Sequence, residues 1–182
     1  IVGIVTDYVN VWEKPEHLSG LKILNPFDSA REALQDLKGR VDLTVCVYHG
    51  GFERDLNTGR ILSKTAENIA YRLCQELEFD ILLTGHQHMS IAGRMVSGTY
   101  TVQSPDCGRS FVSINVSISD GQVKYDSQIL DAGGNCSSDL LNRFDSMERG
   151  AQGWLDVVVG HLNQPLLPSP PLIMAAEGSE IA

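Results

Sequence analysis

The stretch Asp80-Ile81-Leu82-Leu83-Thr84-Gly85-His86-Gln87-His88 is a short apolar run that ends in a glycine and then presents two histidines. A run of this length and composition predicts a buried strand of a parallel sheet. A second stretch of the same kind lies upstream, where residues 43–48 lead into His49-Gly50-Gly51-Phe52-Glu53. Ligands bind to open α/β sheets outside the carboxyl ends of the strands. If the two strands are parallel neighbours, we expect His49, His86 and His88 to converge at one edge of the sheet.

The rest of the first half alternates strand and helix patterns around these two runs. Residues 1–9 read as a buried strand, and the polar segment 10–20 reads as a loop. Helical spacing of apolar residues follows from a cap at Asp28 or Ser29 to Gly39, and again over residues 63–77 after a cap at Ser63. The order strand, helix, strand, helix, strand predicts an α/β fold with a parallel sheet and helical crossovers.

The second half of the chain has a different sequence pattern. Residues 111–118 and 123–130 are short apolar runs joined by Ser119-Asp120-Gly121-Gln122, which predicts an antiparallel hairpin. Residues 138–160 return to helical periodicity, and a proline-rich segment follows at 164–171. We therefore divide the chain into residues 1–134, an interdomain helix at 135–163, and a linker with the start of a further domain at 164–182.

The amino-acid composition limits the range of functions that the chain can have. The chain has 182 residues, 42% of them hydrophobic, and a formal net charge of −9, which gives no electrostatic footprint for a nucleic acid polymer or an anionic membrane. An anionic substrate would need a local positive centre, which a metal ion could supply. No apolar stretch reaches the roughly 18 to 20 residues of a transmembrane helix. The chain opens in what reads as mid-strand, so we expect a segment upstream of Ile1.

The four cysteines show neither a C-x-x-C spacing nor the framework of a small disulfide-rich domain. They fall on a strand, a helix and two loops, so no pair is evidently brought within disulfide range. We expect Cys46, Cys74, Cys107 and Cys136 to be free thiols.

Three histidines in glycine-containing segments at the ends of adjacent strands favour a metal site. Neutral imidazole is a common ligand of divalent metals, and its second nitrogen normally needs a hydrogen-bond acceptor, for which Glu53 is a candidate. Three histidines alone would suit one catalytic zinc ion. His86 and His88 alternate along a strand-like segment, however, and would point to opposite sides of it, which favours two adjacent ions.

These two histidine motifs resemble the last two metal motifs of the calcineurin-like metallophosphoesterases. The run Ser104-Pro105-Asp106-Cys107-Gly108 and the Trp154-Leu155 helix resemble the branch that contains 5′-nucleotidases and 2′,3′-cyclic-nucleotide phosphodiesterase/3′-nucleotidases. Residues 177–182 resemble the opening of the C-terminal nucleotide-binding domain of that branch. The resemblance implies a partial metallophosphoesterase sandwich. It also implies two divalent ions (Zn, Mn, Fe or Mg), with His49 and His86 on one and His88 on the other.

The resemblance further implies a hydrolase that acts on a nucleotide or another small phosphoester, and a location outside the cytoplasm. The earlier motifs of the family, Asp-x-His, Gly-Asp and Gly-Asn-His-Glu/Asp, are absent from this sequence. We therefore expect the C-terminal half of a catalytic domain, inactive by itself, whose partners are the N-terminal half and the nucleotide-binding domain. Two alternatives stay open: a non-catalytic binding or structural module that retains the fold, and a mononuclear zinc hydrolase.

Overall fold

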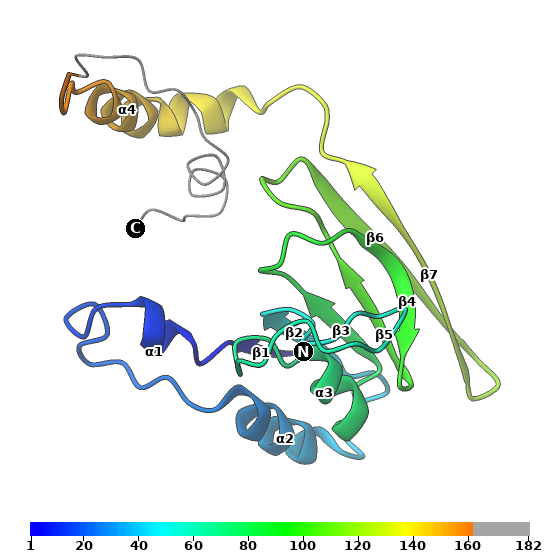
Figure 1. Cartoon of the computed structure of the whole chain (residues 1–182). Helices are drawn as coiled ribbons and strands as arrows, with labels where there is room; N and C mark the ends of the chain where they lie inside the picture. The colour runs from blue at the N-terminus through cyan, green and yellow to red at the C-terminus, as the bar shows by residue number, and fades with distance from the viewer. Residues whose placement is uncertain (162–182) are drawn as a thin grey trace. The chain divides into compact units, whose positions relative to one another are not determined.

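The computed structural model describes residues 1–161, which fall into two compact units. The first unit comprises Ile1–Gly133 and contains every strand of the described chain (Figure 1). The described part of the second unit runs from Gly134 and contains one long helix. The proline-rich segment at 164–171 and residues 177–182, which were expected to open a further domain, lie outside the described residues.

The first unit is built on a five-stranded sheet with the strand order β1-β2-β3-β5-β4. The strands are β1 (Val2–Val5), β2 (Val45–His49), β3 (Ile81–Thr84), β4 (Ile91–Val96) and β5 (Thr99–Gln103). The first three are parallel neighbours, β5 pairs parallel to β3, and β4 is an antiparallel edge strand. The predicted α/β class with parallel strand-helix-strand units is therefore confirmed.

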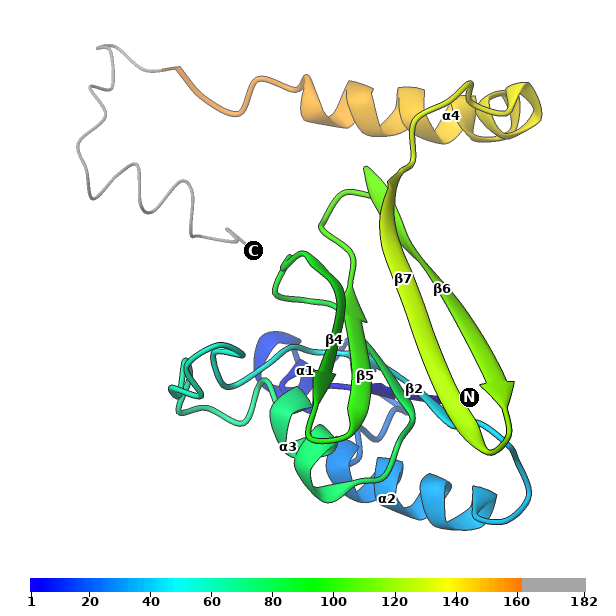
Figure 2. The same cartoon turned by 90° about the vertical axis from the view of Figure 1, so that its right-hand side faces the viewer.

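Two helices cover one face of this sheet. They are α2 (Pro26–Leu37) in the crossover from β1 to β2 and α3 (Ala70–Glu76) in the crossover from β2 to β3, and they lie on the same side of the sheet (Figure 2). Side chains alternate across the strands, so Cys46 and Tyr48 face the helices and are buried, whereas Val47 faces the other way and is 41% exposed. The hydrophobic core thus lies between the helices and one face of the sheet.

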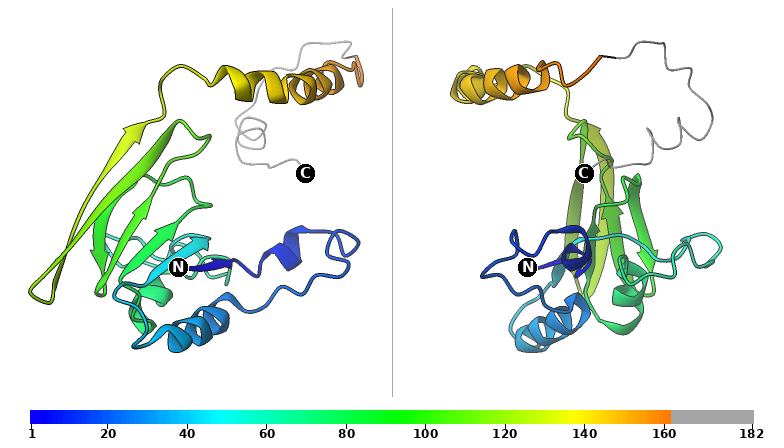
Figure 3. Two further views of the ribbon diagram at one scale, coloured as in Figure 1. Left: turned by 180° about the vertical axis from the view of Figure 1, so that it is seen from behind. Right: turned by 60° about the vertical axis from the view of Figure 1, so that its left-hand side comes forward.

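Both helix starts differ from the predicted ones. Helix α2 begins earlier, because the Asn25 side chain accepts a hydrogen bond from the Asp28 amide (3.0 Å) and Pro26 occupies the first helical turn, where a missing N–H costs nothing. The predicted cap at Asp28 or Ser29 was wrong. Helix α3 begins only at Ala70, so the predicted helix over 63–77 with a Ser63 cap was also wrong in its first half. A short helix, α1 (Val9–Trp12), replaces the start of the predicted loop and follows β1 directly (Figure 3).

The predicted antiparallel hairpin is confirmed. Strands β6 (Ser110–Ser119) and β7 (Gln122–Asp131) pair along their whole length. Asp120 and Gly121 both adopt positive φ (51° and 73°), as a two-residue turn with the twist of a hairpin requires. The stacked rings of Tyr100 and Tyr125, 4.7 Å apart, join this hairpin to the main sheet.

The second unit contains α4 (Ser138–Leu155), which starts as predicted and ends earlier than residue 160. The Ser137 hydroxyl caps it by accepting from the Leu140 amide (3.5 Å). Its apolar residues are exposed in the described chain: Leu140, Leu141, Phe144, Met147, Trp154 and Leu155. Among the described residues, none of the helices combines the length and apolarity that crossing a bilayer requires.

All four cysteines are free thiols, as predicted. Cys46 and Cys74 are buried in the core, and burial raises the pKa of each thiol to about 12. Cys107 and Cys136 are exposed. The hydrogen bond from the Cys107 thiol to the Asp106 carboxylate raises the pKa of Cys107 as well, because that bond exists only while the thiol keeps its proton.

We expect iodoacetamide at pH 8 to modify two cysteines of the folded chain and four of the denatured chain. The thiolate is the reactive form, so Cys136 should react before Cys107, and Cys46 and Cys74 should react only after unfolding. Mass spectrometry of tryptic peptides over time gives the order. Rapid labelling of Cys46 or Cys74 in the native protein would contradict the placement of these residues in the core.

Candidate metal site

The two central strands bring two of the three predicted histidines together. Strands β2 and β3 run parallel in the register Tyr48↔Thr84, and each ends at the same edge of the sheet. The imidazole centroids of His49 and His86 lie 5.4 Å apart, with their rings inclined by 62°. The predicted convergence of His49 and His86 at the carboxyl edge of one sheet is therefore confirmed.

Beyond the strands, side-chain and backbone hydrogen bonds join the two loops. The Gly85 amide donates to the Gly50 carbonyl (3.2 Å). Gln87 then takes the place of a strand partner: its Oε1 accepts from the Phe52 amide (2.7 Å), and its Nε2 donates to the Phe52 carbonyl (3.0 Å). Phe52 is fully buried, so this paired contact anchors the His86 loop on the His49 loop.

The glycines after His49 are required by this close approach. A Cβ atom on Gly51 would lie 2.1 Å from Oε1 of Gln87, and one on Gly50 would lie 2.1 Å from the Tyr48 ring. Real Cβ atoms do not tolerate such distances, so an alanine at either position would displace the side chain that it meets. The two glycines are thus part of the mechanism that keeps the two loops together.

The segment around His86 does not continue the strand. His86 and His88 both adopt left-handed backbone conformations, with φ of 67° and 54°. The argument that the two rings alternate across an extended segment was therefore wrong in its premise. Non-glycine residues with positive φ are uncommon and cluster at functional sites, where the surrounding structure holds them.

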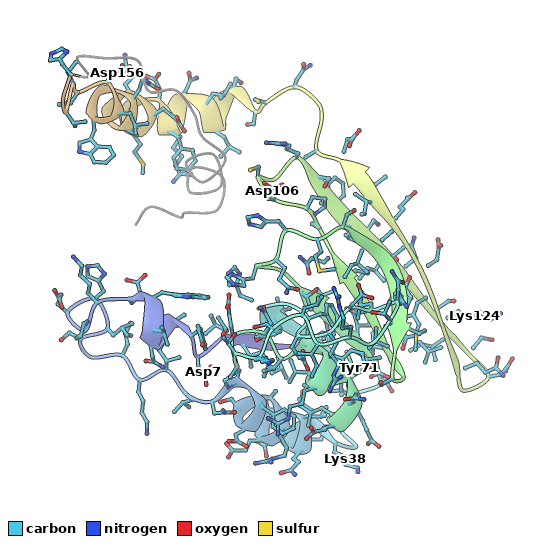
Figure 4. All side chains as sticks on the ribbon, viewed as in Figure 1. Asp7, Lys38, Tyr71, Asp106, Lys124 and Asp156 are labelled. Atoms are coloured by element: carbon cyan, nitrogen blue, oxygen red, sulfur yellow. The ribbon has the colours of Figure 1, made fainter. Side chains whose placement is uncertain are left out.

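The acceptor on the His86 imidazole is Glu67, not Glu53. An oxygen of the Glu67 carboxylate lies 2.8 Å from His86 Nε2, and the two side chains are 29% and 21% exposed. Glu53 instead accepts from the amides of Tyr71 (2.9 Å) and Arg72 (2.8 Å) at the start of α3, and so caps that helix from a distance. Tyr71 is labelled on this helix in Figure 4.

Hydrogen bonds to the backbone of Glu67 and to the neighbouring Asn68 hold Glu67 in place. Its carbonyl accepts from the hydroxyls of Thr6 (2.7 Å) and Tyr48 (3.1 Å), and the next residue, Asn68, accepts from the Gly51 amide through its side chain (2.6 Å). These tertiary bonds keep residues 67 and 68 out of the helix that their spacing predicts. No local sequence signal identifies Glu67 as the partner of His86.

His88 lies in a different environment. The buried Gln103 amide bonds the Thr84 hydroxyl (2.9 Å), and in its better-satisfied orientation its oxygen accepts from the amides of Met89 (2.8 Å) and His88 (3.3 Å). Asp106, labelled in Figure 4, lies in the loop between β5 and β6. The Cys107 thiol, with smaller contributions from the charges of Arg109 and His88, lowers the pKa of Asp106.

A second contact to His86 comes from Trp12 on α1. The indole stacks on the imidazole with ring centroids 5.0 Å apart and an angle of 29° between the planes. The loop assigned to residues 10–20 gave no reason to place this residue at the site.

The donor set fits one divalent ion in part. The centroid separation of His49 and His86 is compatible with two nitrogens at about 2.0 to 2.1 Å from a shared zinc ion. With His86 Nε2 bonded to Glu67, Nδ1 of that ring is the nitrogen available to a metal. Among the described residues, however, no group of three or more ligating side chains converges on one point.

Comparison with known proteins supports the fold assignment. No family model matches the sequence, and no significant match exists among curated proteins. A similar solved structure is described as "Putative 5'-Nucleotidase from Staphylococcus aureus in complex with alpha-ketoglutarate". It aligns with a TM-score of 0.72 and 27% identity over 88% of this chain and 32% of its own. The chain thus has a nucleotidase-like phosphoesterase fold and spans about a third of the length of that protein.

Thr6→Val should destabilise the folded chain by about 1–3 kcal/mol. Thr6 is fully buried, and its hydroxyl both donates to the Glu67 carbonyl and accepts from the Tyr8 amide (3.3 Å), so valine removes one of the two hydrogen bonds to that carbonyl and leaves the Tyr8 amide without this acceptor. Urea unfolding followed by circular dichroism measures the change. The control Thr65→Val, at an exposed threonine, should change stability by less than about 0.5 kcal/mol. Equal effects of the two variants would contradict the assigned role of Thr6.

Proposed function

We propose that this chain is part of a metal-dependent phosphoesterase that hydrolyses nucleotides, of the 5′-nucleotidase or the 2′,3′-cyclic-nucleotide phosphodiesterase/3′-nucleotidase type. The observation that carries the proposal is the pair His49 and His86, 5.4 Å apart at the carboxyl edge of a parallel sheet in a nucleotidase-like fold. Packing alone gives no reason for two partly exposed imidazoles to meet where such sheets bind ligands.

In this proposal His49 and His86 hold one divalent ion, and His88 contributes to a second. The ions, Zn, Mn, Fe or Mg, would supply Lewis acidity and offset the negative charge of the phosphoryl group. Glu67 accepts the hydrogen bond of the other His86 nitrogen, which selects the tautomer with a free Nδ1 lone pair. The net charge of −9 makes such a positive centre necessary for an anionic substrate.

The described residues supply too few ligands for this task. Two dications about 4 Å apart repel each other by about 16 kcal/mol at an effective dielectric constant of 20, four times the value for unit charges. Bridging carboxylates normally offset that repulsion, and the part of the chain that the structure describes has no convergent group of three ligands. We therefore propose that the remaining ligands come from an N-terminal half of the catalytic domain.

One face of the sheet is exposed at β1 and β2, where an N-terminal half of the domain could pack. Parallel sheets are almost always covered on both faces, yet Val5 (39%) and Val47 (41%) are exposed on the face opposite α2 and α3. A groove of about 480 Å³ beside β1 is lined by Val5, Val47 and His49 of this face, together with Lys22, Leu24 and the first turn of α2, among others. His49 therefore borders the surface that the additional polypeptide would cover.

Substitution of Val47 tests this covering layer. Val47→Lys should be nearly neutral in the 182-residue chain, where the side chain is partly exposed, and should destabilise a full-length protein by more than about 2 kcal/mol, because it would bury a charge. Ile61→Lys, at a 53% exposed loop position, serves as the matched control in both proteins. Equal effects of Val47→Lys in the two proteins, measured by thermal unfolding, would argue against a covering layer.

The activity test compares this chain with the full-length protein. We expect the 182-residue chain to bind Zn²⁺ or Mn²⁺ weakly and to leave AMP and 2′,3′-cyclic AMP intact, and the full-length protein to hydrolyse at least one of them in a metal-dependent way. Alanine at His49, His86 and His88 should abolish that turnover. Robust hydrolysis by the short chain would refute the incomplete site. Full activity of the triple variant would refute the metal ligands, and a full-length protein that binds metal without turnover would favour a binding module.

A further inference from the structure

The His86 imidazole is confined on three sides. Trp12 stacks on its face, Glu67 accepts at Nε2, and the edge of His49 meets it at a centroid distance of 5.4 Å. The backbone of His86 itself is in the left-handed region, so its side chain leaves the chain in a direction that ordinary strand geometry would not give. Of these contacts, the one from Trp12 has no role in the function proposed above.

The packing of Trp12 on the surface gives little reason for a tryptophan at this position. The indole remains 47% exposed, so much of its apolar area gains little from burial. It belongs to a helix of only four residues with no side-chain cap, which has little stability by itself. Its contacts are with other rings: His86 at 5.0 Å, and Tyr8 edge-on at 5.9 Å.

The same hydrogen-bond network that places Glu67 also places this short helix. Thr6 Oγ1 donates to the Glu67 carbonyl and accepts from the Tyr8 amide, and the Thr6 amide donates to the His49 carbonyl (3.1 Å). Fully buried Thr6 therefore links the segments of Glu67 and Trp12 to the strand that carries His49. The Glu67 carboxylate and the Trp12 indole are the two groups that hold His86.

We propose that Trp12 is a positioning residue for His86, which fixes the plane of the imidazole toward a bound metal ion. This inference rests on the proposed metal site. An imidazole donates its lone pair in the plane of the ring, so rotation of the ring about its bond to Cβ turns the free nitrogen away from the ion. Glu67 restrains one nitrogen only, and a ring held at one point can still tilt. The stacked indole removes that tilt and keeps water from one face of His86.

The test measures Zn²⁺ affinity by competition with a chromophoric chelator, using the 182-residue chain and, where it is obtained, the full-length protein. The variants Trp12→Leu and Trp12→Met remove the ring, Trp12→Phe keeps a stacking partner, and Trp154→Leu is the control at a 77% exposed tryptophan of the second unit. His49→Ala and His86→Ala test the site itself. Urea unfolding of each variant is measured in parallel.

We expect Trp12→Leu and Trp12→Met to weaken Zn²⁺ binding by about tenfold, the lower end of what loss of a residue that orients a ligand costs. Trp12→Phe should stay within about threefold of the parent affinity, and Trp154→Leu should match the parent. In histidine-labelled NMR spectra, the metal-free Trp12→Leu protein should show the His86 ring protons shifted downfield, because the ring current of the indole is lost. Assignment by His86→Gln identifies these signals among the five histidines.

Each outcome decides one question. Unchanged Zn²⁺ affinity in a folded Trp12→Leu or Trp12→Met variant, in which His49→Ala still abolishes binding, overturns the positioning role and leaves the metal site intact. Reduced stability without reduced affinity shows that Trp12 has a purely structural role and overturns it as well. Zn²⁺ binding that neither histidine variant affects overturns the metal site and the positioning role together.

Discussion

The site depends on one constraint, the contact between the Gln87 side chain and the Phe52 backbone. Parallel strands β2 and β3 bring His49 and His86 to the same edge, but their ladder ends at Tyr48↔Thr84, and the chain is free to diverge beyond it. The two hydrogen bonds of the Gln87 amide, at 2.7 and 3.0 Å, continue the pairing where the backbone cannot. Because a Cβ on Gly51 would occupy the same space as this amide, the residue after Gly50 must be glycine.

In this arrangement, His86 and His88 adopt left-handed backbone conformations, which are energetically unfavourable. Such a residue is disfavoured by roughly 1–2 kcal/mol. It persists because fixed groups lie on every side: Gln87 is paired with Phe52, His86 is bonded to Glu67, and the His88 amide faces the buried Gln103. The imidazoles are thus presented by a backbone that the surrounding hydrogen bonds hold in place before any ligand binds, which lowers the entropy lost on binding.

The sequence predicts the parts of this site that follow from local pattern. Two apolar runs that each end in histidine and glycine predict parallel neighbours and convergent imidazoles, and Asp120-Gly121 predicts the hairpin turn. Residues 63–69 were predicted as helix because their apolar spacing continues that of α3. In the folded chain the carbonyl of Glu67 accepts from Thr6 and Tyr48, and Asn68 bonds Gly51, so long-range hydrogen bonds prevail over helical propensity. Glu67 and Trp12 reach His86 only through such contacts, which is why sequence patterns did not reveal them.

Charge explains why the proposed function needs groups beyond the described residues. The carboxylate of Glu67 points at His86, and Asp106, whose pKa is lowered by the Cys107 thiol and nearby positive charge, stays ionised near His88. Each of these carboxylates would repel a phosphate that approached it without a bound cation. Lys22 lines the groove beside His49, but a single lysine on a chain of net charge −9 offsets little of this repulsion. In the proposed function, a nucleotide phosphate would require bound cations at this edge of the sheet, and those cations would require more anionic ligands than the described residues provide.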